Sequence, residues 1–137
     1  MITQDTKVGI IVQGDLLDWQ KLNITAFLST GIAASTPESI GEHYEDADGN
    51  TYLPLIVQPI FVYHATKAQL IRTKERALTR GITPAIYAEG MFKTDNDKDN
   101  RAVAKLLTAD NFNIVGIALR AERKVFDKIV NGLKLHP

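Results

Sequence analysis

Lysine, asparagine and carboxylate side chains gather where a long apolar helix is predicted to begin. Asp15, Asp18, Lys21 and Asn23 fall on or just before the first turns of a predicted helix over residues 16–34, which follows an apolar strand. Asp15 or Asp18 is expected to cap this helix. In open α/β sheets, ligands bind beyond the carboxyl ends of the strands, where helix N-termini present free N–H groups. The sequence therefore predicts a pocket here for a small polar or anionic ligand.

A second polar group follows a predicted strand at residues 84–88. Lys93, Thr94 and Asp95 lie in the polar stretch after this strand, and the loop over 88–95 is expected to close the pocket. The predicted ligand-binding residues are Asp18, Lys21, Asn23, Lys93 and Thr94. A simpler alternative stays open, in which the helix lysine extends along apolar surface to reach water and the asparagine caps or bonds a neighbouring loop.

Patterns that resemble metal sites are incomplete. Asp95, Asp97 and Asp99 alternate as at the start of a calcium loop, but Asn100 replaces its glycine and Leu106 its bidentate glutamate. A solvated loop before a helix explains these acids better. The histidines lack the four-residue spacing of a helical zinc pair; they are His43, His64 and His136. Since cysteine and glycine-rich phosphate loops are also absent from the sequence, we expect neither a metal nor a cofactor.

Length and charge exclude several classes of protein. The chain has 137 residues, with 16 Lys and Arg balanced by 16 Asp and Glu. This length predicts a single domain over residues 1–137, with an ordered core at about 7–135. A neutral total excludes attraction to nucleic acid by overall charge. Because the sequence has neither a membrane-span run nor a signal-peptide pattern, we expect a cytoplasmic protein without membrane contact.

The neutral total is the sum of two opposed segments. Residues 38–48 are acidic and contain no lysine or arginine, whereas the predicted helix over 66–80 carries five cations against one glutamate. This basic face could contact the phosphates of tRNA or another RNA. Because it has no aromatic stacking platform beside it, we favour a solvated face or a pairing with the acidic segment.

Periodicity and turn residues predict an alternation of strands and helices. Thr66 and Gln69 have the form of a capping box, Gly81 suits a helix end, and Asp48-Gly49 suits a type I′ turn. Strands are predicted at 7–13, 59–63, 84–88 and 113–119, helices at 16–34, 66–80, after residue 100 and at 122–130, and a hairpin at 41–53. This order predicts a three-layer α/β/α sandwich with a small mixed sheet of four to five strands.

Several segments also carry a family resemblance. They are residues 8–12, 15–23, 47–49, 114–119 and 132–135. Their order and spacing, over about residues 7–135, resemble an uncharacterised bacterial family known as domain of unknown function number two thousand. That family is similar in fold to type II peptidyl-tRNA hydrolases, so the resemblance implies a hydrolase-like α/β/α sandwich.

The first signature of those hydrolases is only partly matched. They cleave the ester between a peptide and its tRNA, and their first helix opens with Asp-Leu-x-x-x-x-Gly-Lys followed by Ala-x-Gln. Asp15-Leu16 matches this opening, and Lys21 takes the place of the lysine if one residue is deleted. The glycine is absent, and residues 23–25 differ from the small residues and glutamine of the family.

The second signature departs further. An Asp-Ala-Gly-x-Thr segment after a strand corresponds to residues 88–91, so the Asp is lost unless Glu89 replaces it and the Thr is lost unless Thr94 does. Ester hydrolysis needs a positioned base or a group that polarises water. The roles that the resemblance implies are Lys21 as electrophile or phosphate-binding group, Glu89 or Asp95 as base, and Thr94 positioning water.

Three classes of function therefore stand at this point. Ligand binding beside the first helix leads, without a commitment to catalysis. Hydrolysis of peptidyl-tRNA or a related ester is the first alternative, and a homodimeric structural or interaction module with an exposed apolar patch is the second.

Overall fold

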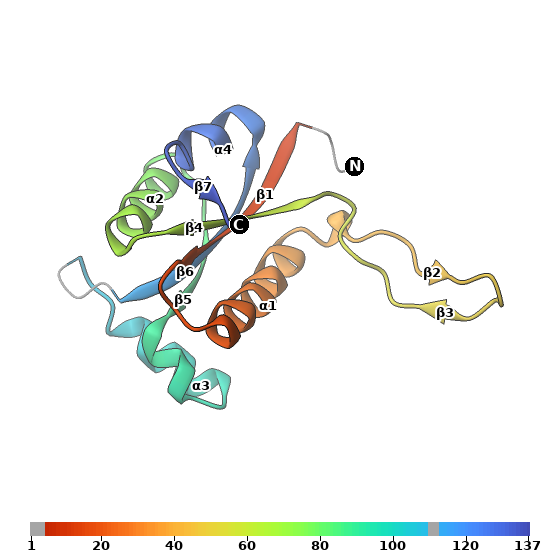
Figure 1. Cartoon of the computed structure of the whole chain (residues 1–137), viewed down its shortest axis with the longest axis horizontal. Coiled ribbons are helices and arrows are strands. Elements are labelled where there is room, and N and C mark those ends of the chain that lie inside the picture. The colour runs from red at the N-terminus through yellow and green to blue at the C-terminus, as the bar shows by residue number, and fades with distance from the viewer. Residues whose placement is uncertain (1–4, 110–112) are drawn as a thin grey trace.

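A mixed five-stranded sheet lies between helices in the computed structural model, which describes residues 5–109 and 113–137 (Figure 1). Its strand order is β5-β6-β1-β4-β7. Strands β1 and β4 are parallel, while β6 runs antiparallel to both β1 and β5, and β7 antiparallel to β4. The strands are β1 (Thr6–Gln13), β4 (Ile60–Ala65), β5 (Ala85–Ala88), β6 (Ile114–Glu122) and β7 (Lys134–Leu135).

The helices alternate with these strands, which confirms the predicted order. They are α1 (Asp18–Ser35), α2 (Lys67–Thr79), α3 (Asp97–Lys105) and α4 (Arg123–Ile129), with short 3-10 turns η1 (Pro37–Ser39) and η2 (Glu89–Lys93). A separate hairpin pairs β2 (Tyr44–Glu45) with β3 (Thr51–Tyr52). The sequence did not predict β7, because two residues are too few to show a strand periodicity.

Helices cover both faces of the sheet, as predicted. α1 buries Ile24, Leu28 and Ile32 on one face, and α2 and α4 bury Leu70 and Phe126 on the other. Successive strand residues point to opposite faces: Ile10 and Ala118 belong to the core under α1, and Ile11 and Ile117 to the core under α2 and α4. Strands β1 and β6 therefore contribute side chains to both cores, which explains their apolar composition.

The helix starts differ in how well the sequence predicts them. Thr66 and Gln69 form the expected capping box on α2, and Gly81 follows that helix with φ +73°. For α1 the expectation that Asp15 or Asp18 is the N-cap is wrong. Leu17 is the N-cap, because the Gln20 side chain reaches back and accepts a hydrogen bond from the Leu17 N–H at 3.0 Å. Asp18 lies in the first turn, where its charge still favours the helix dipole.

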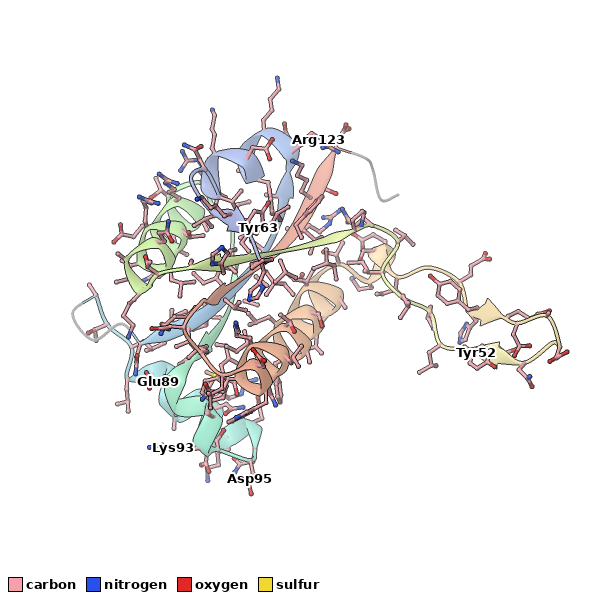
Figure 2. The ribbon with its side chains drawn as sticks, in the orientation of Figure 1. Tyr52, Tyr63, Glu89, Lys93, Asp95 and Arg123 are labelled. Carbon is pink, nitrogen blue, oxygen red and sulfur yellow. The ribbon has the colours of Figure 1, made fainter. Side chains whose placement is uncertain are left out.

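Residues 41–57, which we call the arm, project from the body of the protein (Figures 1 and 2). At its base the Gly41 N–H donates to the Leu55 carbonyl at 3.0 Å and the Val57 N–H to the Ser39 carbonyl at 2.8 Å. The arm exposes large apolar side chains: Tyr44, Tyr52, Leu53, Leu55 and Val57 are each more than half exposed. A two-stranded hairpin is marginal by itself in water, so the arm depends on local hydrogen bonds.

The sequence predicted a type I′ turn at the end of the arm, but the structure has a turn of another type. A type I′ turn needs two consecutive residues with positive φ. Gly49 has φ +86°, but its neighbour Asp48 does not have a positive φ, nor does any other described residue that is not glycine. The Gly49 N–H donates to the Asp46 carbonyl and the Asp46 N–H to the Asn50 carbonyl. The loop therefore fits a type I turn followed by a bulge at Gly49. This loop has one residue more than the predicted turn.

The carboxylate of Asp46 organises this turn. It accepts hydrogen bonds from the Tyr52 hydroxyl at 2.6 Å, from the Asn50 side chain at 3.0 Å, and from the backbone N–H groups of Asn50 and Asp48. The hydroxyl of Tyr52, followed by the groups of Asn50, lowers the pKa of Asp46 from 3.8 to about 2. Because the folded-state pKa is lowered, this contribution to stability is present above pH 3.8 and is lost as the pH falls through about 2.

We therefore predict that Tyr52→Phe raises the pKa of Asp46 from about 2 towards 3.8. The largest of the hydrogen bonds to the carboxylate is then missing, so the arm loses its order at a higher pH than in the unmodified protein. The measurement is a ¹³C NMR titration of the Asp46 carboxyl group. Tyr44→Phe, on the opposite strand, is the control and should leave the titration unchanged; an equal pKa in both variants would refute the assignment.

Candidate functional site

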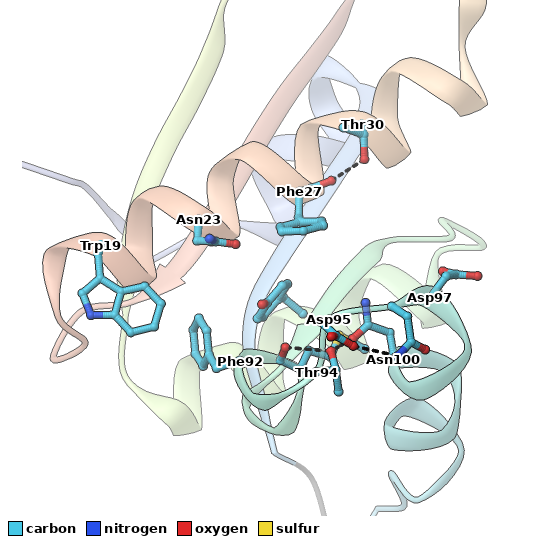
Figure 3. Close-up of a pocket in the computed structure, with 12 residues that line it drawn as sticks. Trp19, Asn23, Phe27, Thr30, Phe92, Thr94, Asp95, Asp97 and Asn100 are labelled. Carbon is cyan, nitrogen blue, oxygen red and sulfur yellow. Dashed lines mark hydrogen bonds between the residues drawn. The ribbon is translucent and has the colours of Figure 1, made fainter.

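A groove of about 610 Å³ opens between α1 and the segment that runs from η2 into α3 (Figure 3). We call it the aromatic groove. The α1 residues that line it recur every three or four positions, as expected for one side of a helix; they are Trp19, Asn23, Phe27 and Thr30. Figure 3 shows Trp19, Asn23 and Phe27 reaching down from α1 towards Phe92 and Thr94. Helix α1, which covers one face of the sheet, thus forms one whole wall of the aromatic groove.

Aromatic rings make up the apolar part of the groove. The Trp19 and Phe92 rings meet edge to face with centroids 5.6 Å apart, and the Tyr87 ring lies 5.0 Å from Phe92 and 5.9 Å from Phe27. Trp19 and Phe27 are each 54% exposed, so they leave ring surface available for a ligand. The Tyr87 phenol is uncharged at neutral pH, and burial raises its pKa further above the ordinary value.

Polar groups on the loop before α3 form the rim. The Thr94 hydroxyl lies within hydrogen-bond distance of the Met91 carbonyl and of the Asn100 side chain. Asn96 caps α3 by accepting from the Asp99 N–H at 2.8 Å, and its amide group donates to Asp95 at 2.9 Å. The cap fixes the loop and, through it, the position of the Asp95 carboxylate at the mouth of the groove.

The rim carries negative charge. Asp97 is neutralised by Arg101, whose Nε lies 2.7 Å from its carboxylate. In the described part of the chain, Asp95 has no cationic partner, and the Asn23 side chain on the opposite wall has no hydrogen-bond partner. An exposed carboxylate, a free amide and a hydroxyl therefore surround a cavity with aromatic walls.

Lys21 lies on another side of α1. Its ammonium group is 3.1 Å from Nε2 of His136 and 4.0 Å from the Asp18 carboxylate, beside a cavity of about 440 Å³ that these three residues help to line. Nδ1 of His136 lies 3.1 Å from the Pro137 carbonyl. The imidazole thus donates from Nδ1, and its Nε2 accepts from the lysine.

The structure divides the residues that the sequence had grouped. Asn23, Thr94 and Asp95 share the aromatic groove, while Lys21 and Asp18 line the other cavity. Two residues along a helix turn the side chain by about 200°, so Lys21 and Asn23 diverge. The remaining two candidates, Glu89 and Lys93, are exposed and lie outside the lining of the groove (Figure 2).

Sequence reasoning missed the aromatic walls and the partner of Lys21. None of Trp19, Phe27 and Phe92 was singled out from the sequence as a site residue. Their spacing did contain a signal, since Trp19, Asn23 and Phe27 follow one another at intervals of four. The contact with His136 joins residues 115 positions apart, which a local pattern does not reveal.

The described ranges contain neither a metal-binding cluster nor a membrane-spanning helix. Among residues 5–109 and 113–137, no group of three histidine or acidic side chains comes together to hold a metal ion. None of the helices in these ranges is both long and apolar enough to cross a membrane.

Comparisons with known proteins place the chain in a family. The family model described as protein of unknown function (DUF2000) matches residues 6–137. A solved structure of a protein of unknown function from Agrobacterium tumefaciens strain C58 is 48% identical, with a TM-score of 0.96, over 98% of this chain and 100% of that one. A search of curated proteins finds no match. Because the family model spans nearly the whole sequence, the chain belongs to the DUF2000 family of proteins of unknown function.

Proposed function

We propose that the protein binds a small ligand in the aromatic groove, and that this ligand combines a planar ring with a positively charged or hydrogen-bond-donating group. The observation that carries the proposal is the pairing of exposed aromatic rings with an unneutralised carboxylate. Trp19, Phe27 and Phe92 offer ring faces and edges, and Asp95 and Asn23 offer acceptors at the open side. Aromatic walls with a nearby carboxylate are a common means of recognising organic cations.

The charged residues that line the aromatic groove restrict the class of ligand that the sequence suggested. A polar or anionic ligand was expected because the helix start and Lys21 were placed in the same pocket, but Lys21 lies in the other cavity. Among the described residues, the groove lining contains Asp95 and Asp97 and no lysine or arginine. The groove therefore favours a polar or cationic ligand over an anionic one.

The test compares benzamidine, a flat ring with a positive charge, with benzoate, which has the same ring and a negative charge. The chain contains a single tryptophan, so one indole N–H signal in a ¹H–¹⁵N spectrum reports on Trp19. We expect benzamidine to shift this signal saturably in the low-millimolar range. We expect benzoate to bind about tenfold more weakly, because Asp95 repels it.

Variants locate the charge preference. Asp95→Asn should weaken benzamidine binding about fivefold and reduce the difference from benzoate, since exposed ion pairs contribute at most about 1 kcal/mol. Glu45→Gln removes one negative charge from the distant arm and is the matched control, with unchanged binding of both compounds. Equal affinities for benzamidine and benzoate in the unmodified protein would overturn the proposed ligand class.

Peptidyl-tRNA hydrolysis, and the likeness to the hydrolase fold on which it depends, remain predictions. The residues assigned to that reaction do not share one cavity: Thr94 and Asp95 line the aromatic groove, Lys21 lines the other cavity, and Glu89 is exposed. A reaction needs its base and its electrophile within reach of the same atom. Ligand binding is therefore the better-supported function.

A second candidate function, self-association through the arm, has an observation of its own. We infer that the partner is a second copy of this chain, because the arm is acidic and α2 is basic. Glu42, Glu45 and Asp48 are exposed on the arm. Arg72 is exposed on α2, and so is Arg80, which directly follows this helix. The arm extends away from the sheet and from α2 of its own chain (Figure 1). A second copy offers both the opposite charge and apolar surface for the exposed leucines.

A further inference from the structure

A third cavity, of about 650 Å³, lies at the carboxyl ends of the parallel strands β1 and β4. We call it the strand-end crevice. After β1 the chain enters α1 on one face of the sheet, and after β4 it enters α2 on the other. Where helices following neighbouring parallel strands leave to opposite faces, their connecting loops separate and a crevice opens between them. The topology itself therefore produces this cavity.

Positive groups line one side of the crevice. Lys67 begins α2, and its ammonium group is held 2.8 Å from the Asn113 side chain. Lys134 lies on β7, and its ammonium group has no polar partner in the part of the chain that the structure describes. The α2 capping box uses the N–H groups of Thr66 and Gln69, so the N–H groups of Lys67 and Ala68 are free of partners among the described residues. Together these groups favour an anion.

Acceptors line the other side. Gln13 donates through its amide nitrogen to Asp15 at 2.8 Å, which fixes the orientation of the amide. The Oε1 atom of Gln13 is then buried, and it has no hydrogen-bond partner in the described part of the chain. A buried acceptor without a donor costs free energy, and such atoms mark places where a bound group supplies the missing donor.

Glycines leave the crevice open to a ligand. Gly14 and Gly132 both line it. Gly132 has φ +93°, a conformation that favours glycine, and a Cβ on Gly14 would point at the His64 ring from 3.4 Å. A ligand can therefore approach the backbone of both loops without meeting a side chain at these positions.

We propose that the strand-end crevice binds a small phosphate ester of a polyol, at a site separate from the aromatic groove. The phosphate group lies against Lys67, Lys134 and the first turn of α2, where charge-assisted hydrogen bonds hold it. Hydroxyl groups of the polyol donate to the Asp15 carboxylate, on the side of the crevice where Oε1 of Gln13 lacks a donor. This division of donors and acceptors explains why a carboxylate stands in a crevice that otherwise favours an anion.

The experiment uses the full chain and three probes: ribose 5-phosphate, inorganic phosphate and ribose. Binding is followed by the ¹H–¹⁵N signals of Lys67 and Ala68. We expect saturable shifts with both phosphate compounds, at least threefold tighter for ribose 5-phosphate, and no shift with ribose alone. Equal affinity for the two phosphate compounds would overturn the polyol part of the proposal, and the absence of saturation with either would overturn the site.

Charge-matched variants separate a built site from general attraction. Lys67→Gln with Lys134→Gln should weaken ribose 5-phosphate binding about tenfold. Lys124→Gln with Lys128→Gln, two exposed positions on α4, removes the same charge and should change binding less than twofold. An equal loss in both pairs would show non-specific attraction and refute the crevice. An unchanged fold, checked by the rest of the spectrum, accompanies each comparison.

Discussion

Replacing Gly116 with alanine is expected to destabilise the protein by about 3 kcal/mol, at the upper end of the range for overpacked cores. A Cβ at this position of β6 would lie 2.4 Å from Cγ2 of Ile24 and 3.2 Å from Cδ1 of Leu28. Both side chains belong to α1 and are almost fully buried. The helix therefore has to move away from the sheet, or two buried side chains have to leave their preferred rotamers.

Thermal and urea unfolding measure this effect, and a loss of about 3 kcal/mol corresponds to a fall in Tm of roughly 10 °C. Gly14→Ala is the matched control: its Cβ would meet the His64 ring no closer than 3.4 Å, which is ordinary contact, and its φ is not positive. That variant should be neutral or slightly stabilising. Equal stabilities of the two variants would contradict the close approach of α1 to β6.

The Gly116 contact also links the fold to the aromatic groove. The residues of α1 that touch Gly116 are one stripe of the helix, and Trp19, Asn23 and Phe27 are another stripe of the same helix. A displacement of α1 therefore moves one complete wall of the groove. For this reason Gly116→Ala should also weaken benzamidine binding, whereas Gly14→Ala should not.

The second large effect concerns self-association through the arm. Leu53→Lys together with Leu55→Lys should weaken dimerisation more than a hundredfold, because burial of these two side chains contributes about 3 kcal/mol or more. The leucines are 78% and 63% exposed in the single chain, so the stability of the monomer should hardly change. Raised salt should also weaken the dimer, because acidic residues of the arm pair with basic residues of α2.

Sedimentation at several protein concentrations measures this association. Leu106→Lys is the control, since Leu106 is 70% exposed and lies at the end of α3, away from the arm. It should leave the dimer unchanged. A sedimentation coefficient that stays at the monomer value at every concentration, in the unmodified protein, would refute the dimer.

Local rules explain which parts of the fold the sequence predicts. The α2 capping box and its terminal glycine depend on residues within one turn of each other, and both are present as predicted. The buried strands β1 and β6 are recognisable by their continuous apolar runs. The turn of the arm was harder, because Asp46 reorganises it by accepting hydrogen bonds from residues up to six positions away.

The candidate site shows where local rules stop. Asn23 and Thr94 line one groove, because the helix and the loop after a neighbouring strand end face each other. Lys21 lines a different cavity from Asn23, because two residues along a helix are about 200° apart around its axis and the sequence grouping took no account of that angle. Phe92 was missed because its role depends on a ring contact with Trp19, 73 positions earlier.

The most direct test of the central claim is a set of intermolecular NOEs between benzamidine and the protein. Ligand binding in the aromatic groove predicts contacts from the benzamidine ring to the side chains of Trp19 and Phe92. The amidinium group should lie on the side of Asp95. NOEs to these residues that disappear on competition with excess unlabelled ligand would support the account. Contacts confined to the strand-end crevice or to the cavity beside Lys21 would contradict it.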